Sequence, residues 1–138
     1  MKNASFLVAG ALAAIVPTAT PASAAPRLSP QQQLDKALAG RVAGKPVDCI
    51  NPHTYSNTQI IDRTAIIYGS GRTIYLQQPD HPQSLRDDDV LVTDLRGSGQ
   101  LCSIDIVKLH DRNGGWYRGF VGLNKFVPYI RAQTASRD

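Results

Sequence analysis

Two aspartates stand out because each interrupts an apolar run that is typical of a β-strand. Asp62 follows two isoleucines in "IIDRTAIIY", and Asp105 lies between two isoleucines in "QLCSIDIVKLHD". On adjacent strands, within about 10 Å and open to solvent, the two carboxylates could be the general acid and base of a small hydrolase. A buried carboxylate otherwise needs donors, and for Asp105 these would be loop amides or an arginine such as Arg63. We favour this structural interpretation, so Asp62, Arg63 and Asp105 form a candidate polar site without a catalytic role.

Other groups that could do chemistry do not form a recognisable set. The histidines, His53, His81 and His110, are far apart in the chain, which contains no glutamate. A nuclease built on a histidine pair or a His/Glu pair therefore has no visible constellation. The run Asp87–Asp89 lacks the alternate ligand spacing and the glycine of a calcium loop, and it predicts a solvated acidic loop. We predict no catalytic residue, no metal site and no cofactor.

The charge balance does not favour a nucleic-acid partner. The chain has 15 Lys and Arg against 11 Asp and Glu, and 14 against 11 without Lys2. The charges are interspersed, and no basic run is long enough for a nucleic-acid arm.

The first residues predict export. Lys2 precedes an uncharged apolar run (4–16) and an Ala-x-Ala site at 22–24, the order of a secretory signal peptide. The run is shorter than the roughly 20 residues of a membrane-spanning helix, so we expect no stable membrane insertion after cleavage before Ala25. The protein would then be periplasmic or secreted. The expected organisation is a signal peptide (1–24), a mobile leader (25–29), a single globular domain (30–130) and a flexible tail (131–138).

The two cysteines fit this compartment. Cys49 and Cys102 are the only two in the chain, and neither has a second cysteine or a histidine at metal-ligand spacing. An even pair in an exported protein predicts a disulfide. The bridge would close a loop of more than fifty residues.

The remaining signals predict one helix followed by strands. Ser29, Pro30 and Gln32 make a capping box at the start of a short helix, whose apolar stripe continues to Val42. Strands are expected at 60–68, 72–78, 90–95, 100–110 and 116–123, separated by glycine-containing or polar turns, with "NKFVPYI" closing the domain. The fold class is mainly β (α+β): a short N-terminal helix docked on an antiparallel five- to six-stranded curved sheet or small open barrel, with one disulfide.

The strand around Asp105 is expected to be central and covered on both sides. Alternation places Cys102, Ile104 and Ile106 on an inward face. In "GGWYRGF", Trp116 and Tyr117 point to opposite faces, so one of them should be in the core. Core packing is also favoured for the two phenylalanines Phe120 and Phe126.

The motifs "DCI", "IDRTAIIY", "QLCSIDIVKLHD" and "LNKFVPY" resemble a family of small exported proteins of Gram-negative bacteria whose function is unknown. The resemblance covers roughly residues 48–129. It implies that the two cysteines and the two aspartates above occupy recurring positions. Members often carry further cysteines where this chain has Leu85 and Val121, so this chain would keep one bridge. Leu123-Asn124 stands where the family has Leu-Gly.

Two functions remain open at this point. The first is a non-enzymatic exported domain that binds a ligand or an envelope protein through one face of its sheet. The second is the small secreted hydrolase that uses Asp62 and Asp105.

Overall fold

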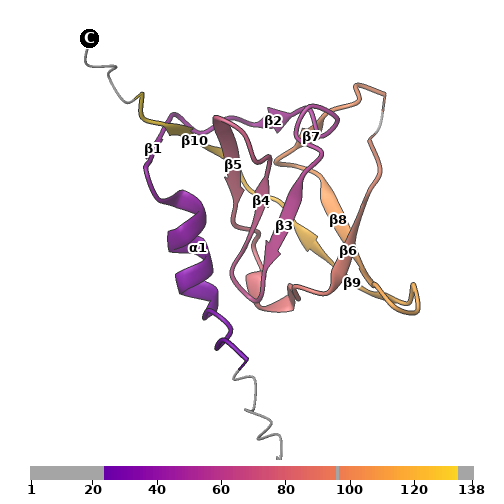
Figure 1. Cartoon of the computed structure of the whole chain (residues 1–138). Helices are drawn as coiled ribbons and strands as arrows, with labels where there is room; N and C mark the ends of the chain where they lie inside the picture. The colour runs from indigo at the N-terminus through magenta and orange to yellow at the C-terminus, as the bar shows by residue number, and fades with distance from the viewer. Residues whose placement is uncertain (1–23, 96, 134–138) are drawn as a thin grey trace, which may run out of the picture.

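The computed structural model describes residues 24–95 and 97–133. Apart from Ala24, the predicted signal peptide lies outside these residues, as do positions 134–138 of the predicted tail. The described chain is mainly β with one α-helix, and every strand pairing is antiparallel, as predicted (Figure 1). The elements are α1 (Pro30–Leu38), β1 (Arg41–Ala43), β2 (Cys49–Ile50), β3 (Thr58–Ile61), β4 (Ala65–Tyr68), β5 (Thr73–Gln77), the 3-10 helix η1 (Pro82–Ser84), β6 (Asp89–Thr93), β7 (Leu101–Cys102), β8 (Ile106–Asp111), β9 (Tyr117–Gly122) and β10 (Val127–Arg131).

Helix α1 begins as the sequence predicts. The Ser29 side chain accepts a hydrogen bond from the Gln32 amide, and the Gln32 side chain accepts one from the Ser29 amide. The helix ends earlier than expected, because Gly40 has a φ of 68° and turns the chain into β1. The predicted stripe through Val42 is therefore wrong: Val42 lies in β1 and is 64% exposed.

The larger sheet has the order β1-β10-β5-β4-β3. Strand β4 is buried along its whole length, and alternate residues serve two different cores. Ala65 and Ile67 face the cluster that includes Leu34 of α1, whereas Ile66 and Tyr68 belong to the cluster shared with the smaller sheets. The strand predicted over 60–68 is in fact two strands, because residues 62–64 form a turn between β3 and β4.

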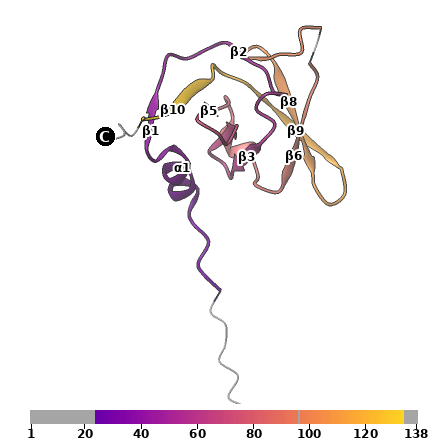
Figure 2. The same cartoon turned by 45° about the horizontal axis from the view of Figure 1, so that its top comes forward.

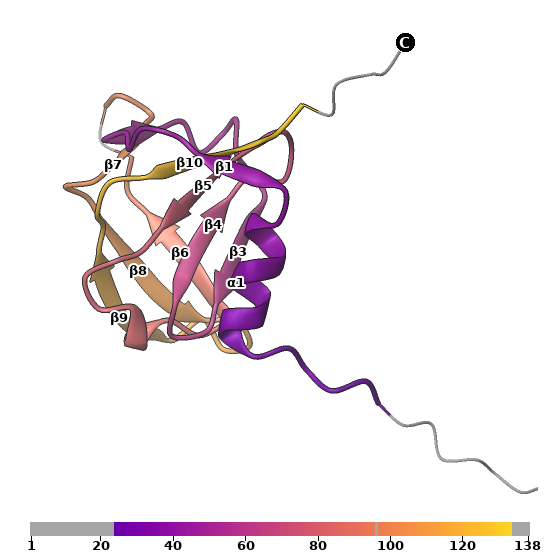
Figure 3. The same ribbon diagram turned by 90° about the vertical axis from the view of Figure 1, so that its left-hand side faces the viewer.

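A three-stranded sheet, β6-β8-β9, covers the other side of the larger sheet. Its inward residues Val107, Leu109 and Val121 are buried beside Phe126 in the shared core. The molecule therefore has three layers, with α1 on one side of the larger sheet and β6-β8-β9 on the other (Figure 3). Figure 2 shows α1 on the same side as β1 and β10, away from β6, β8 and β9. The barrel-like arrangement is open: β3 and β6 are edge strands of separate sheets.

Candidate functional site

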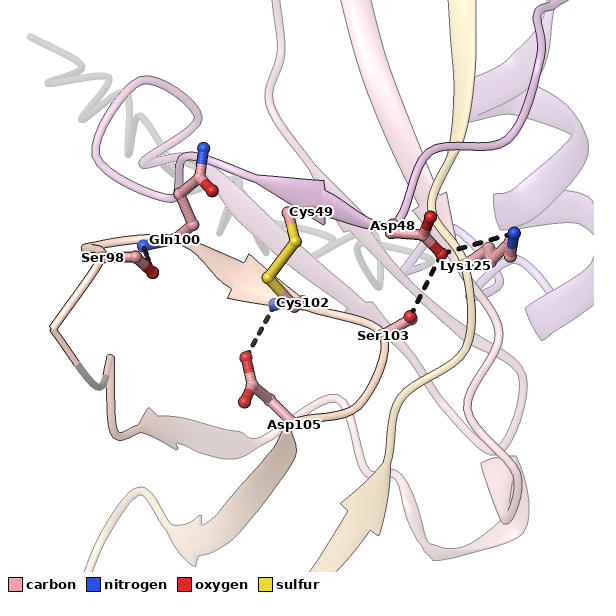
Figure 4. The surroundings of a disulfide bond; sticks show 8 residues. All are labelled: Asp48, Cys49, Ser98, Gln100, Cys102, Ser103, Asp105 and Lys125. Carbon is pink, nitrogen blue, oxygen red and sulfur yellow. Dashed lines mark hydrogen bonds and ion pairs between the residues drawn. A yellow bond between two sulfur atoms is a disulfide. The ribbon is translucent and has the colours of Figure 1, made fainter.

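The disulfide joins the short strands β2 and β7. Cys49 and Cys102 are direct cross-strand partners with Cα atoms 4.0 Å apart, so the predicted bridge is confirmed (Figure 4). Next to the bridge the Ser103 amide donates to the Asp48 carbonyl at 2.7 Å, which closes the ladder on that side. The Cys102 amide points the other way and needs a different acceptor.

Asp105 supplies that acceptor. Its Oδ2 accepts a hydrogen bond from the Cys102 amide at 2.7 Å, while its own amide donates to the Cys102 carbonyl at 3.0 Å (Figure 4). The carboxylate thus holds a tight turn between β7 and β8. It is partly exposed and not sealed in a core. A loop amide, and not Arg63, is the donor that its position provides.

This turn overturns the prediction of one continuous central strand. The three residues Ser103–Asp105 separate β7 from β8, and the face that is buried on both sides of this turn is the one opposite to the predicted inward face. Ile104 and Ile106, predicted to face inward with Cys102, are 91% and 51% exposed. Leu101, Val107 and Leu109, predicted on the opposite face, are the buried ones.

Asp62 and Arg63 lie in the turn after β3, at the other end of the molecule. The Arg63 amide donates to the Leu85 carbonyl at 3.1 Å, directly after η1, and Arg63 has the left-handed φ of 52°. The Arg63 Nε and the Asp62 Oδ2 are 4.0 Å apart on largely exposed side chains, which makes a weak pair. In Figure 1 the turn between β3 and β4 lies at the lower end of these strands, whereas the segment that joins β7 to β8 lies in the upper part of the view. The structure does not bring Asp62 and Asp105 together.

The most distinctive surface is the outer face of the β6-β8-β9 sheet. Two rows of cross-strand partners cross it: Val90–His110–Tyr117 and Val92–Lys108–Phe120. Solvent-facing positions of an antiparallel sheet are usually polar, but most of these are large and apolar. We call this surface the apolar outer face. Its large exposed strand residues are Val90, Val92, Ile106, Tyr117 and Phe120, and Ile104 and Trp116 are exposed in the adjoining loops.

Local contacts hold the aromatic end of the apolar outer face in place. The His110 and Tyr117 rings pack edge to face with centroids 5.6 Å apart, and His110 Nδ1 lies 3.0 Å from the Gly115 carbonyl oxygen. The Trp116 indole lies over Gly114, where a Cβ would overlap it. Asp111 Oδ1 accepts hydrogen bonds from the Asn113 and Gly114 amides and so fixes the same turn. These rings are already ordered for contact with another surface.

The other end of the apolar outer face is hollowed. A shallow pocket of about 380 Å³ is lined by Val92, Asp94, Ile104, Asp105, Ile106 and Lys108. Asp105 therefore contributes to the rim of this surface, although its carboxylate already accepts the Cys102 amide. Lys108 is the cation in the middle of the face.

The sequence prediction for the aromatic residues is only partly correct. Phe126 is fully buried, as predicted, but Phe120 is 57% exposed. Trp116 and Tyr117 are 74% and 59% exposed, so neither is in the core. Tyr117 faces solvent because β9 has a bulge, in which Arg118 is the additional residue between the partners of Leu109 and His110, whereas Trp116 precedes the strand. Counting alternate residues along the sequence assigns the wrong face to residues on the far side of such a bulge.

The bulge also directs Arg118 to a carboxylate that sequence reasoning missed. Asp89, predicted to be solvated with its neighbours, has a fully buried side chain, and its Oδ1 lies 2.6 Å from Arg118 Nη1. Its Oδ2 has no hydrogen-bond partner among the residues that the structure describes, and neither has the buried Tyr68 hydroxyl. Burial raises the pKa of Asp89, and the charge of Arg118 opposes part of this shift. The sequence did contain a signal for this burial. Asp89 directly precedes the apolar run that begins at Val90, and it is the first residue of the strand that this run forms.

Asp89 and Tyr68 line one cleft of about 530 Å³ between the edge strands β3 and β6. An acceptor and a hydroxyl at its floor could hold water or a small polar group. Ser56, Thr58 and Thr93 add further hydroxyls to the lining of this cleft, and its cation is Arg112. Arg112 donates weakly to the Asp88 and Asp89 carbonyls at 3.4 and 3.3 Å.

Residues 24–95 and 97–133 contain no group of three metal-ligating side chains that could hold an ion. Over the same ranges, no helix is long and apolar enough to cross a membrane.

No family model matches this chain, and no curated protein and no solved structure matches it significantly. The function must therefore be argued from the site itself.

Proposed function

We propose that this protein is an exported, non-enzymatic binding module that docks a protein of the cell envelope through its apolar outer face. The observation that carries the proposal is the gathering of five large exposed apolar side chains on one sheet face, with Ile104 and Trp116 exposed in the adjoining loops and an edge-to-face ring contact at one end. Contiguous apolar patches of this kind on a folded domain mark interaction sites. Export is supported by the signal-peptide pattern and by the disulfide, which persists in oxidising compartments such as the periplasm or the extracellular medium.

The composition of the face favours a protein over other partners. Tyr, Trp and Phe are the residues that protein interfaces enrich, and Val and Ile fill the space between them. An anionic membrane would require several cations, but Lys108 stands in the middle of the face and Asp94 and Asp105 lie at its edge. A sugar site would need more polar groups beside the rings. A second copy of this chain would bring one Lys108 toward another.

The hydrolase alternative finds no support in the geometry. Asp62 and Asp105 lie in separate turns: the Asp62 carboxylate makes a weak, exposed pair with Arg63, whereas the Asp105 carboxylate accepts a hydrogen bond from the Cys102 amide. Their strands, β3 and β8, belong to different sheets.

Site-specific photo-cross-linking in cells tests the proposed surface. Benzoylphenylalanine at position 120 should give a discrete adduct, whereas the same probe at the exposed helix position Gln31 should not. Val92→Asp should abolish the adduct because it places a charge inside the apolar outer face. The matched control is Val42→Asp, which is also exposed but lies in β1, outside this face.

An adduct that survives Val92→Asp, or one that position 31 gives equally well, would overturn the proposed docking face. Export is tested separately by N-terminal sequencing, with Ala25 as the expected first residue.

A further inference from the structure

A second candidate site lies between α1 and the larger sheet, on the opposite side from the apolar outer face. Only Leu34 of α1 is buried, so the helix does not fill the space above the sheet. A cavity of about 710 Å³ remains there, which is within the size range of small-molecule sites. Its apolar surface includes the sheet residues Ile67 and Ile74, together with Leu28 and Ala37.

The charged lining of this cavity is strongly one-sided. Arg27, Lys36, Arg41 and Arg131 line it, and Asp87 is the single acid among its lining residues. The excess of cations over anions in the whole predicted mature chain is only three, so the concentration of four cations around one cavity is notable. Such a cavity attracts an anion.

Two of these arginines oppose each other directly. Arg41 in β1 is the cross-strand partner of Arg131 in β10. Like charges at such positions are destabilising. Burial, and in second place the charge of Arg131, lower the pKa of Arg41. Arg41 is nevertheless held in place, because its Nη1 and Nη2 donate to the Arg72 and Gly71 carbonyls at 2.9 Å.

We propose that this cavity binds a single-chain amphiphilic anion, a carboxylate or phosphate that carries an alkyl chain. The head group bridges Arg41 and Arg131 and relieves their repulsion, since guanidinium groups form strong charge-assisted hydrogen bonds with oxyanions. The alkyl chain lies along the cavity against Leu28 and Ala37, and the almost fully buried Ile67 and Ile74 form the base of the cavity. This site shares no element with the apolar outer face, so it can fail while the proposed function stands.

Calorimetric titration of the mature, disulfide-bonded protein with dodecanoate below its micelle concentration tests the site. Dodecanoate should bind and raise the Tm, because a ligand that binds only the folded state stabilises it. Inorganic phosphate should bind at least about tenfold more weakly, because it lacks the chain, and dodecanol should not bind, because it lacks the charge. If phosphate bound as tightly as dodecanoate, or if dodecanol did, the proposal that the ligand is an amphiphilic anion would be overturned.

Vesicles of phosphatidylglycerol distinguish a free ligand from a membrane surface. The protein should remain in the supernatant when these vesicles are sedimented. Sedimentation with the vesicles in the absence of dodecanoate binding would replace the proposed ligand with a lipid surface.

Arg131→Glu separates a binding role from a structural one, because the two expected effects have opposite signs. The new carboxylate faces Arg41, so the Tm of the empty protein should rise, while dodecanoate affinity should fall at least about tenfold. The matched control, Lys45→Glu, makes the same charge change at an exposed residue outside the cavity and should bind as the wild type does.

Arg131→Gln provides a second variant that introduces no new charge, and it should also lose affinity. Unchanged dodecanoate binding in both Arg131 variants would overturn the site. Neither variant should alter the Phe120-position cross-link, so the two proposals are tested independently.

Discussion

The two larger sheets of this protein both carry apolar residues on two faces, but only the five-stranded sheet is covered on both faces. In the five-stranded sheet, α1 and the opposite sheet cover the two faces of β4, and all four residues of that strand are buried. In the three-stranded sheet, the inward Val107, Leu109 and Val121 are buried, but the outward row of Val92 and Phe120 faces solvent. An apolar strand pattern therefore indicates that a face is suited to burial, and does not say whether this chain provides the cover.

The buried polar residues of the sheets also differ in whether they are paired. Gln77 in β5 is fully buried and each of its polar atoms has a partner, since its Nε2 donates to the Asn124 carbonyl at 2.6 Å and its Oε1 accepts from the Asn124 amide at 3.1 Å. Asp89 in β6 is equally buried, but one of its carboxylate oxygens is left without a partner among the described residues. The difference depends on position and not on the sheet, because Tyr68 in β4 of the larger sheet also has a buried hydroxyl without a partner among the described residues.

The largest expected effect comes from a pair of phenylalanines. Phe126→Ala should lower the free energy of unfolding by about 3–5 kcal/mol, because it opens a cavity in the shared core. Phe120→Ala should change it by less than about 0.5 kcal/mol, because its ring is already exposed. Urea unfolding of both variants measures the difference. A large loss in Phe120→Ala would mean that the apolar outer face is covered within the protein itself.

The buried ion pair should give a smaller, pH-dependent effect. Because the native pKa of Asp89 is raised, its contribution to stability is present below the ordinary aspartate pKa of about 4 and is lost as pH rises through the native pKa. Arg118→Met should cost about 3 kcal/mol at pH 7, where it leaves a buried carboxylate unpaired, and less at acid pH, where Asp89 takes up a proton.

Urea unfolding between pH 3.5 and pH 8 checks this behaviour, with Asp89→Asn as the control that cannot titrate. Relative to the control, the stability of the wild type should decline with rising pH. An increase relative to the control would show that Arg118 outweighs burial.

The smallest effect on the free energy of unfolding is expected at the turn that joins β7, which carries Cys102, to β8 of the three-stranded sheet. Asp105→Ala should cost about 1 kcal/mol because the Cys102 amide loses its acceptor, whereas Asp105→Asn keeps a carbonyl acceptor and should stay within about 0.5 kcal/mol of the wild type. Thermal unfolding with the disulfide intact compares the two. An equal loss in both variants would mean that the charge, and not the hydrogen bond, holds the turn.

Features with local signals were predictable from the sequence. The capping box at Ser29 and the glycine-containing turn between β4 and β5 are short-range patterns, and the disulfide followed from an even pair of cysteines in a chain expected to be exported. The turn at residues 62–64 was missed because Arg63, and not glycine or asparagine, takes the left-handed conformation there. The turn at Asp105 was missed because both faces of its apparent strand are apolar.

The candidate site was less predictable because it depends on how strands meet. Asp89 and Arg118 are 29 residues apart and meet only because β9 has a bulge. Arg41 and Arg131 face each other because β10 returns to pair with β1. The register between strands that are distant in sequence has no local signature. The cavity between α1 and the larger sheet and the apolar outer face could therefore be recognised only from the structure.

The position of the disulfide decides how this protein would transmit a pulling force. Strands β3, β4, β5 and β6 all lie between Cys49 and Cys102, which are separated by 53 residues. Tension applied at the two ends of the chain passes through the bridge from β2 to β7, so these four strands bear none of it once β10 has separated from β5. The oxidised chain would therefore extend less than the reduced chain by on the order of 180 Å, the extended length of the enclosed segment. An envelope protein bound to the apolar outer face would contact β8 and β9, which lie outside that protected loop, and β6, which lies inside it.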